Sequence, residues 1–177
     1  GMEPAVKPAA EATQSGVIGV LATQTTANGA LYKNVLQRYA SHVRVITQVT
    51  PELVTMVEAN SKHTLESRAI IHHYIDPLLA AGADQIALAC THFPFLLDVL
   101  QEAAGEGVRF IDPGPAVARQ TARVLPASVQ PSDVPNEYFT SGDAAKLQAM
   151  LKLLIGVKAE VQSVGGTGQM NLSSWEL

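Results

Sequence analysis

The sequence predicts an α/β fold in which a mostly parallel sheet is flanked by helices. Short runs rich in β-branched residues alternate with longer segments whose apolar residues recur at helical spacing, and this alternation is typical of β-α-β units. Of the 177 residues, 47% are hydrophobic and 16% are charged, which is enough apolar material to bury a core and excludes intrinsic disorder.

The first half of the chain opens this alternation. Val17–Ala22 is a compact apolar run before a Thr-rich turn, which indicates a buried strand. Residues 30–40 repeat apolar side chains at helical spacing, and residues 43–49 are expected to form the next strand. Thr50 followed by Pro51 marks the start of another helix, because proline is favoured in the first helical turn.

The second half continues in the same way. A long helix is expected from Thr64 to Ala81, closed by Gly82, and is followed by a buried strand at 85–90 and a helix at 93–104. The remaining expected elements, in order, are a strand at 108–111, a helix at 116–124, a strand at 136–140, a helix at 144–155 and a strand at 159–164.

Composition narrows the classes of partner and location. The net charge is −4 and the twelve Lys and Arg residues are scattered singly, which argues against a nucleic-acid or membrane-surface partner. The apolar runs are too short to span a bilayer, and no secretory signal pattern opens the chain. A single cysteine permits no internal disulfide. We therefore expect a cytoplasmic protein.

Binding sites of parallel sheets lie beyond the carboxyl ends of the strands, and Cys90-Thr91-His92 occupies such a position. A cysteine between a strand and a helix start, with an imidazole two residues away, is favoured as thiolate, and His92 could relay its proton. The alternative is an inert buried cysteine. Glu58, at the end of the helix that begins at Pro51, could orient a histidine or could simply be a solvated helix residue.

Two further patterns bear on ligands. The turn from Thr23 to Gly29 offers hydroxyls and backbone amides that suit a carboxylate or phosphate, although its residues could instead only cap the next helix. The neighbouring residues His72 and His73 do not converge on one ligand, and with one cysteine they argue against a metal site.

The stretch Ala87–Leu97 closely resembles the second-cysteine motif of bacterial glutamate racemases, which reads roughly L-G-C-T-H-[FY]-P-L-L. Other segments that resemble this family, in the same order, are Glu3–Ala10, Gly19–Thr26, Ile111–Gly114 and Tyr138–Asp143. Together these segments span residues 1–164, nearly the whole chain.

The resemblance implies two similar α/β lobes with the active site between them, and catalysis without a cofactor. In that family two cysteines, one per lobe, exchange the α-proton of glutamate from opposite faces, which supplies D-glutamate for peptidoglycan. Cys90 would be the acid/base of the second lobe, assisted by His92, with Glu58 held near that histidine. The residues that would bind the substrate are Thr23, Thr26 and Thr91.

The sequence departs from the family pattern in its first lobe, whose D-S-G-x-G-G and C-N-T motifs are absent. We therefore expect residues 1–114 to form one complete lobe, 115–164 part of the other lobe, and 165–177 a Gly- and Ser-rich tail after a proline-rich loop at 126–135. Such a chain is expected to be incomplete and inactive alone, and to form a homo-oligomer that covers its unpaired strand edges.

Two other functions stay open at this point. One is a related aspartate/glutamate racemase or decarboxylase on the same fold, although the Thr-His after the cysteine favours glutamate racemase. The other is a non-catalytic fragment that binds an amino acid or has a regulatory role.

Overall fold

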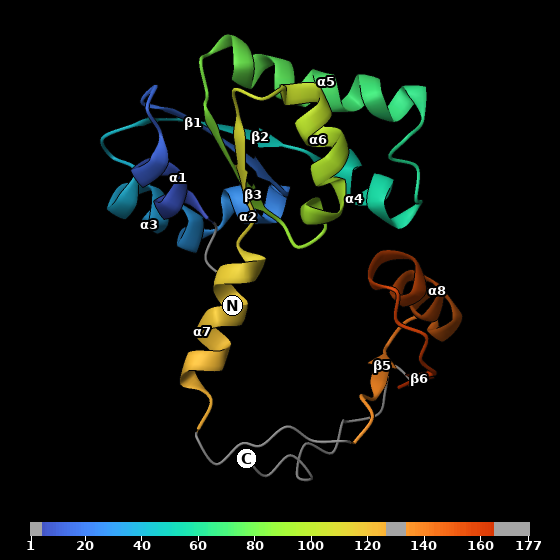
Figure 1. Ribbon diagram of the computed structural model, residues 1–177. Helices are drawn as coiled ribbons and strands as arrows, with labels where there is room; N and C mark the ends of the chain where they lie inside the picture. The colour runs from blue at the N-terminus through green and yellow to red at the C-terminus, as the bar shows by residue number, and fades with distance from the viewer. Residues whose placement is uncertain (1–4, 127–133, 165–177) are drawn as a thin grey trace. The chain divides into compact units, whose positions relative to one another are not determined.

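The computed structural model of this protein describes residues 5–126 and 134–164 (Figure 1). The chain divides into two compact units, Gly1–Pro126 and Ala127–Leu177, and we describe each by itself. Most of the expected loop at 126–135 and the whole expected tail at 165–177 lie outside the described residues.

The first unit is built on a four-stranded parallel sheet with the strand order β2-β1-β3-β4. Its strands are β1 (Val17–Ala22), β2 (Arg44–Val49), β3 (Gln85–Ala89) and β4 (Arg109–Ile111). The chain passes from β1 outward to β2 and then returns to place β3 on the opposite side of β1. The strand order therefore reverses between β1 and β3, which is where open parallel sheets form a binding crevice.

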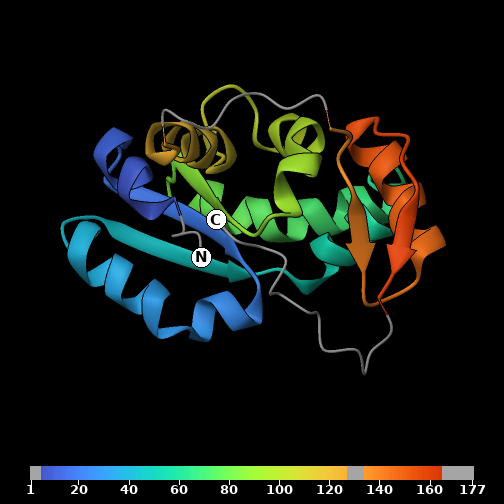
Figure 2. The same cartoon turned by 90° about the horizontal axis from the view of Figure 1, so that it is seen from below.

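Helices cover both faces of this sheet (Figures 1 and 2). The helices of this unit are α1 (Val6–Ala12), α2 (Gln24–Asn28), α3 (Ala30–Tyr39), α4 (Pro51–Glu58), α5 (Leu65–Ala80), the 3-10 helix η1 (Phe93–Leu96), α6 (Leu97–Ala104) and α7 (Gly114–Val124). Helices α1 and α3 lie against one face of the sheet. Helices α5 and α6 lie against the other face, with α4 packed beside α5 and η1.

Strand β1 carries the centre of the core because both of its faces are covered. Ile18, Val20 and Ala22 belong to one buried cluster with side chains of α1 and α3. Gly19 faces α5, where an added Cβ atom would lie only 2.8 Å from Cδ1 of Leu78. The missing side chain at this position lets α5 approach the sheet closely.

The predicted fold class is confirmed, and the predicted strands lie within two residues of their expected bounds. Two short helices, α1 and α2, are additions that the sequence pattern did not predict. The single helix expected at 93–104 is wrong in its first turn, where η1 precedes α6. Pro94 has no N–H to donate, and His92 makes no side-chain cap there, so the turn tightens before the α-helix begins.

The described residues of the second unit, 134–164, form a parallel β-α-β segment. Its elements are β5 (Tyr138–Thr140), α8 (Ala144–Ile155) and β6 (Val161–Ser163). None of the described residues from 134 to 164 is buried, and Phe139, Leu153 and Ile155 are 41%, 47% and 55% exposed. Two strands and one helix therefore do not close a core of their own here.

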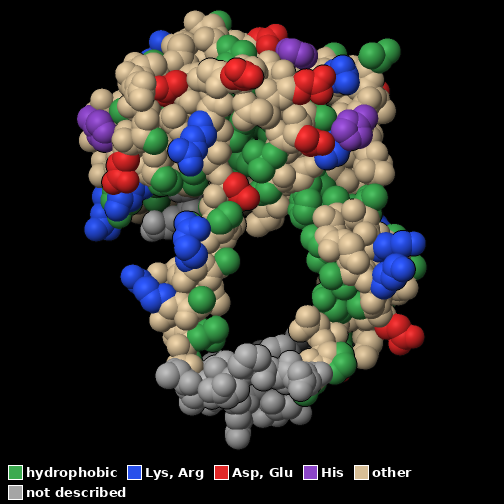
Figure 3. Space-filling model, viewed as in Figure 1, with side chains coloured by type: hydrophobic (Ala, Val, Ile, Leu, Met, Phe, Trp, Pro, Cys, Tyr) green, Lys and Arg blue, Asp and Glu red, His purple; other side chains and the backbone are tan. Residues whose placement is uncertain are grey.

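The surface of the first unit is mixed in charge. On the face of this unit seen in Figure 3, Lys and Arg side chains lie among Asp and Glu side chains and do not gather into one basic area. Within residues 5–126 and 134–164, no helix combines the length and the apolar character needed to cross a membrane.

Candidate active site

The adjacent carboxyl ends of β1 and β3 bring two of the predicted site residues together. Ala22, the last residue of β1, pairs in register with Ala89, the last residue of β3. Thr23 and Cys90 therefore leave the sheet side by side, and both are half-buried. Val49 pairs with Ala22 from the other side, which brings the start of α4 to the same edge of the sheet.

Cys90, His92 and Glu58 form a row of three titratable side chains. Sγ of Cys90 lies 3.8 Å from Nδ1 of His92, and Nε2 of the same imidazole lies 3.4 Å from Oε1 of Glu58. Glu58 ends α4, where the sequence places it, and the side chains of His92 and Glu58 are 34% and 45% exposed. The imidazole thus stands between a thiol and a carboxylate, within reach of a small molecule from solvent.

The turn after β3 sets the relative positions of Cys90 and His92. The N–H of Phe93 donates to the carbonyl of Cys90 at 3.3 Å, and the N–H of Phe95 donates to the carbonyl of His92 at 3.1 Å. Phe93 and Leu96 are fully buried and anchor η1 in the core. The α-helix dipole that the sequence predicts directly behind Cys90 is replaced by a four-residue 3-10 helix.

Thr23 and Thr26 link the end of β1 to the end of β3. The Thr23 hydroxyl donates to Oγ1 of Thr26 at 3.0 Å, and the N–H of Thr26 donates to Oγ1 of Thr23 at 3.3 Å. The Thr26 hydroxyl in turn donates to the carbonyl of Ala89 at 3.4 Å. Thr23 is therefore a helix cap, although of the short α2, and Thr91 lies exposed between Cys90 and His92.

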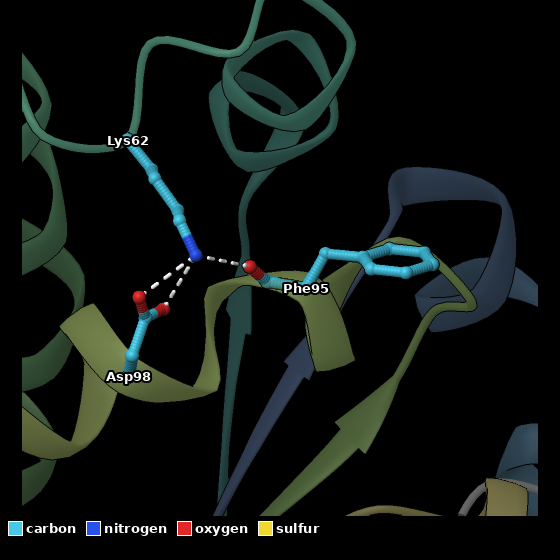
Figure 4. Close-up of polar contacts among 3 residues, drawn as sticks. All are labelled: Lys62, Phe95 and Asp98. Carbon is cyan, nitrogen blue, oxygen red and sulfur yellow. Dashed lines mark hydrogen bonds and ion pairs between the residues drawn. The ribbon is translucent and has the colours of Figure 1, made fainter. Parts of the chain in front are cut away.

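Lys62, in the loop between α4 and α5, makes contacts near this row that the sequence did not single out. Figure 4 shows its ammonium group donating to the carbonyl of Phe95 at 3.1 Å and to the two carboxylate oxygens of Asp98 at 2.9 and 2.8 Å. Partial burial acts to raise the pKa of Asp98, but the hydrogen bonds from Lys62 and the Val99 N–H outweigh it and lower that pKa. Lys62 thus ties the loop after α4 to η1 and α6.

The opposite end of α4 is held by a second polar contact. The hydroxyl of Tyr74, on α5, donates to Oε2 of Glu52 in the first turn of α4. This hydrogen bond lowers the pKa of Glu52. Burial, the same hydrogen bond and the charge of Glu52 raise the pKa of Tyr74 to about 12. Neither residue carries a sequence signal, because their pairing depends on how α4 and α5 pack.

The remaining histidines that the sequence singles out lie in a different setting. Nδ1 of His72 pairs with Asp76 one turn along α5 at 3.0 Å, and the His73 ring packs edge-on against Tyr74. Within residues 5–126 and 134–164, no group of three or more His, Cys, Asp or Glu side chains could hold a metal ion.

The row of Cys90, His92 and Glu58 is suited to proton transfer. If Nε2–H of His92 donates to Glu58, Nδ1 is left with a lone pair that can accept the proton of the Cys90 thiol. A carboxylate that fixes the tautomer and orientation of a histidine, which then acts on a nucleophile or base, recurs in many enzymes. Thr23 and Thr91 lie just after β1 and β3, and Thr26 lies in the short helix α2.

Comparison with known proteins identifies the family of the chain. The profile of the Asp/Glu/Hydantoin racemase family matches residues 1–121, which is more than half of the sequence and contains Thr23, Glu58 and Cys90. The chain belongs to the Asp/Glu/Hydantoin racemase family. The match covers all four strands of the parallel sheet and ends within α7.

Curated members of this racemase family are similar over most of the chain. The glutamate racemase of Ectopseudomonas mendocina is 47% identical over 165 residues, and that of Herpetosiphon aurantiacus is 45% identical over 149 residues. These matches cover 91% and 82% of this chain but 62% and 59% of the relatives. The chain therefore spans about three fifths of the length of these racemases.

Solved structures of glutamate racemases are similar in fold to this chain over most of its length. The crystal structure of Escherichia coli glutamate racemase in complex with L-glutamate and the activator UDP-MurNAc-ala superposes with a TM-score of 0.80 at 30% identity. It covers 95% of this chain, which in turn covers 65% of that structure. The glutamate racemase isoform RacE1 of Bacillus anthracis, at 23% identity and a TM-score of 0.75, shares the fold.

Proposed function

We propose that this chain carries one of the two proton-transfer groups of a glutamate racemase. The observation that carries the proposal is the row in which His92 lies 3.8 Å from the Cys90 sulfur and 3.4 Å from Glu58. The relatives at 45% to 47% identity that are named glutamate racemase support glutamate as the substrate. The product D-glutamate would serve peptidoglycan synthesis in the cytoplasm.

Each residue of the row has a proposed role in moving one proton. The Cys90 thiolate takes the α-proton of glutamate, and the electron pair left on carbon spreads into the α-carboxylate. In the reverse direction the thiol returns a proton to that carbon. His92 accepts and supplies the thiol proton, and Glu58 orients the imidazole. No cofactor is needed, because the thiol and the surrounding hydrogen-bond donors carry the charge changes.

Substrate binding is proposed for the hydroxyls of Thr23, Thr26 and Thr91. The first two are fixed at the carboxyl ends of β1 and β3 by the Thr23–Thr26 hydrogen bond and the bond from Thr26 to Ala89, and the third is the exposed residue after Cys90. Preorganised hydroxyls of this kind can hold a carboxylate without reorganising when charge develops on it.

Racemisation needs a proton donor and acceptor on both faces of the α-carbon, and this sequence has one cysteine. We propose that residues 1–114 form one lobe with Cys90 and that residues 115–164 contribute to a second lobe. Glutamate is the proposed partner, with no nucleic acid and no membrane. Because no described residue from 134 to 164 is buried, we also propose that this segment is covered by another copy of the chain.

The activity can be tested by supplying the second acid/base group. This chain would be joined to the segment of the Ectopseudomonas mendocina relative that it does not match, and D-glutamate formed from L-glutamate would be measured. The joined protein should racemise glutamate, and Cys90→Ser should lower its rate by about a thousandfold. The 177-residue chain alone should form no D-glutamate, because it has one thiol.

Two results would contradict this proposal. If the joined protein folds and binds glutamate but forms no D-glutamate, the chain is an amino-acid-binding fragment and not part of a racemase. If the chain alone racemises glutamate and Cys90→Ser stops it, the requirement for a second thiol is wrong.

A further inference from the structure

Lys62 links the segment after Glu58 to the segment after His92. Lys62 lies four residues beyond the end of α4, and Phe95, whose carbonyl it binds, lies three residues beyond His92. Its ammonium group makes three contacts between 2.8 and 3.1 Å, which matches its three N–H donors. Lys62 is therefore a direct bridge between the two stretches of chain that hold Glu58 and His92 (Figure 4).

The loop that carries Lys62 is itself fixed to both neighbouring helices. The N–H of Ser61 donates to the carbonyl of Met56 in α4 at 3.1 Å, and the Ser67 hydroxyl in α5 donates to the carbonyl of Ser61 at 2.7 Å. These bonds hold the backbone beside Lys62 in place. The Lys62 side chain, through its bond to Phe95, therefore holds η1 at a fixed position relative to this loop.

At the η1 end of this bridge, Lys62 supplies a hydrogen-bond donor to a carbonyl at the end of the 3-10 helix. A 3-10 helix leaves its last carbonyls without intrahelical partners, and Lys62 supplies a donor to one of them, that of Phe95. The Lys62 side chain is only 27% exposed, so its pairing with Asp98 is screened less than a fully solvated ion pair.

We propose that Lys62 is a positioning residue that sets the separation of Glu58 and His92, and thereby controls the reactivity of Cys90. This inference rests on the proposed function, in which Cys90 exchanges protons through His92. Lys62 touches neither the thiol nor the imidazole in this scheme, and it acts through Phe95 and Asp98.

The test measures the rate at which Cys90 reacts with iodoacetamide at neutral pH, in the full 177-residue chain. Iodoacetamide is uncharged, so a change in protein charge does not attract or repel it. Lys62→Met should slow the reaction about fivefold, which corresponds to the loss of a modest part of one positioned contact. In the His92→Ala background the same substitution should have no further effect, because the group that Lys62 positions is gone.

Asp98→Asn and two control variants separate positioning from direct charge effects. Lys62→Met removes a positive charge and Asp98→Asn removes a negative charge, so direct electrostatics would change the rate in opposite directions. Positioning predicts that both variants slow the reaction. Lys62→Arg should restore most of the rate, because its guanidinium can bridge the same carboxylate. Lys33→Met, an exposed position on α3, should leave the rate unchanged.

Each contrary outcome has a distinct meaning. An unchanged rate in Lys62→Met, or opposite changes in Lys62→Met and Asp98→Asn, would overturn the role of Lys62 and leave the proposed function standing. An unchanged rate in His92→Ala would overturn the coupling of Cys90 to His92, and the role of Lys62 with it. If Lys62→Met does not fold, Asp98→Asn decides the question, because Asp98 is 54% exposed and tolerates the change.

Discussion

The Thr26 hydroxyl accepts a hydrogen bond from Thr23 and donates one to the carbonyl of Ala89, the residue before Cys90. A side chain that looks like a binding group in the sequence is thus also part of the frame that holds the thiol. The proposed binding role of Thr26 can be separated from its role in this frame, because the stability of the frame is measurable without substrate.

Thr26→Val keeps the shape of the side chain and removes its hydroxyl. We expect it to lower the free energy of unfolding by about 1 kcal/mol, because the half-buried carbonyl of Ala89 loses its side-chain donor. Urea denaturation followed by circular dichroism measures this loss. Thr25→Val is the matched control, since Thr25 is exposed on the same short helix and should change stability little. Equal losses in the two variants would show that helix propensity, and not the bond to Ala89, is responsible.

The sequence located Thr23, Cys90 and His92 because each follows a strand whose apolar run is easy to identify. It could not locate Lys62 or its pairing with Asp98. These residues are 36 positions apart, and a long charged side chain in a loop has the same pattern whether it is solvated or bridges two elements. Only the packing of α4 against η1 distinguishes the two cases.

Helix α4 is fastened at its beginning by Tyr74 and Glu52, and beyond its end by Lys62. Between these points Leu53, Met56 and Val57 are buried. Helix α4 is therefore held in place near both of its ends, and Glu58 is its last residue. We expect a substitution that removes one of these contacts to change the position of the Glu58 carboxylate.

The Tyr74 contact predicts a specific dependence of stability on pH. The pKa of Tyr74 rises from 10.0 to about 12 on folding, so its contribution to stability is fully present below pH 10 and is lost as the pH rises toward 12. Tyr74→Phe should cost about 1 kcal/mol at neutral pH, and this difference from the unmodified protein should shrink over the alkaline range. Urea denaturation at a series of pH values measures both effects. Tyr32, whose pKa burial also raises, is present in both proteins and cancels in the difference. A difference that stays constant up to pH 12 would contradict the assignment.

The sequence predicted the long elements well and the short ones poorly. Val17–Ala22 and Ala144–Ile155 have the predicted bounds, because each has a full apolar pattern between clear boundary residues. Helix α1 was missed because Pro8 sits inside it, although proline is tolerated in a first turn. Helix α2 has five residues, too few for any periodic pattern. Such short elements are set by caps and tertiary contacts.

At the scale of the whole chain, the alternation of strands and helices is sufficient to predict a parallel sheet but not its strand order. Nothing in the apolar runs specifies that β3 pairs with β1 and not with β2. That pairing places Thr23 beside Cys90, so the proposed site depends on a feature of the sheet that composition and periodicity do not encode.

The second unit leads to a prediction about assembly. A β-α-β segment without a buried residue should associate, because exposed strand edges and apolar side chains favour contact with another surface. Light scattering at micromolar concentration should therefore give at least twice the 18.7 kDa mass of one chain. Phe139→Ser and Leu153→Ser together should shift the protein toward monomer, since these side chains are among the exposed apolar groups. A monomer whose residues 138–163 are protected from hydrogen exchange would contradict the proposal.

The reversal of strand order also affects how quickly the site can assemble as the chain folds. Strands β1 and β2 are close in sequence and can pair early, whereas Thr26 and Ala89 are 63 residues apart and meet only after a long loop has closed. Closing such a loop loses chain entropy before any contact compensates for it, and non-local pairing of this kind slows folding. Thr23, Thr26 and Cys90 are therefore expected to come together late, when β3 docks beside β1. Until then Cys90 lacks Thr23 and Thr26 as neighbours, so the proposed site is complete only when the sheet is complete.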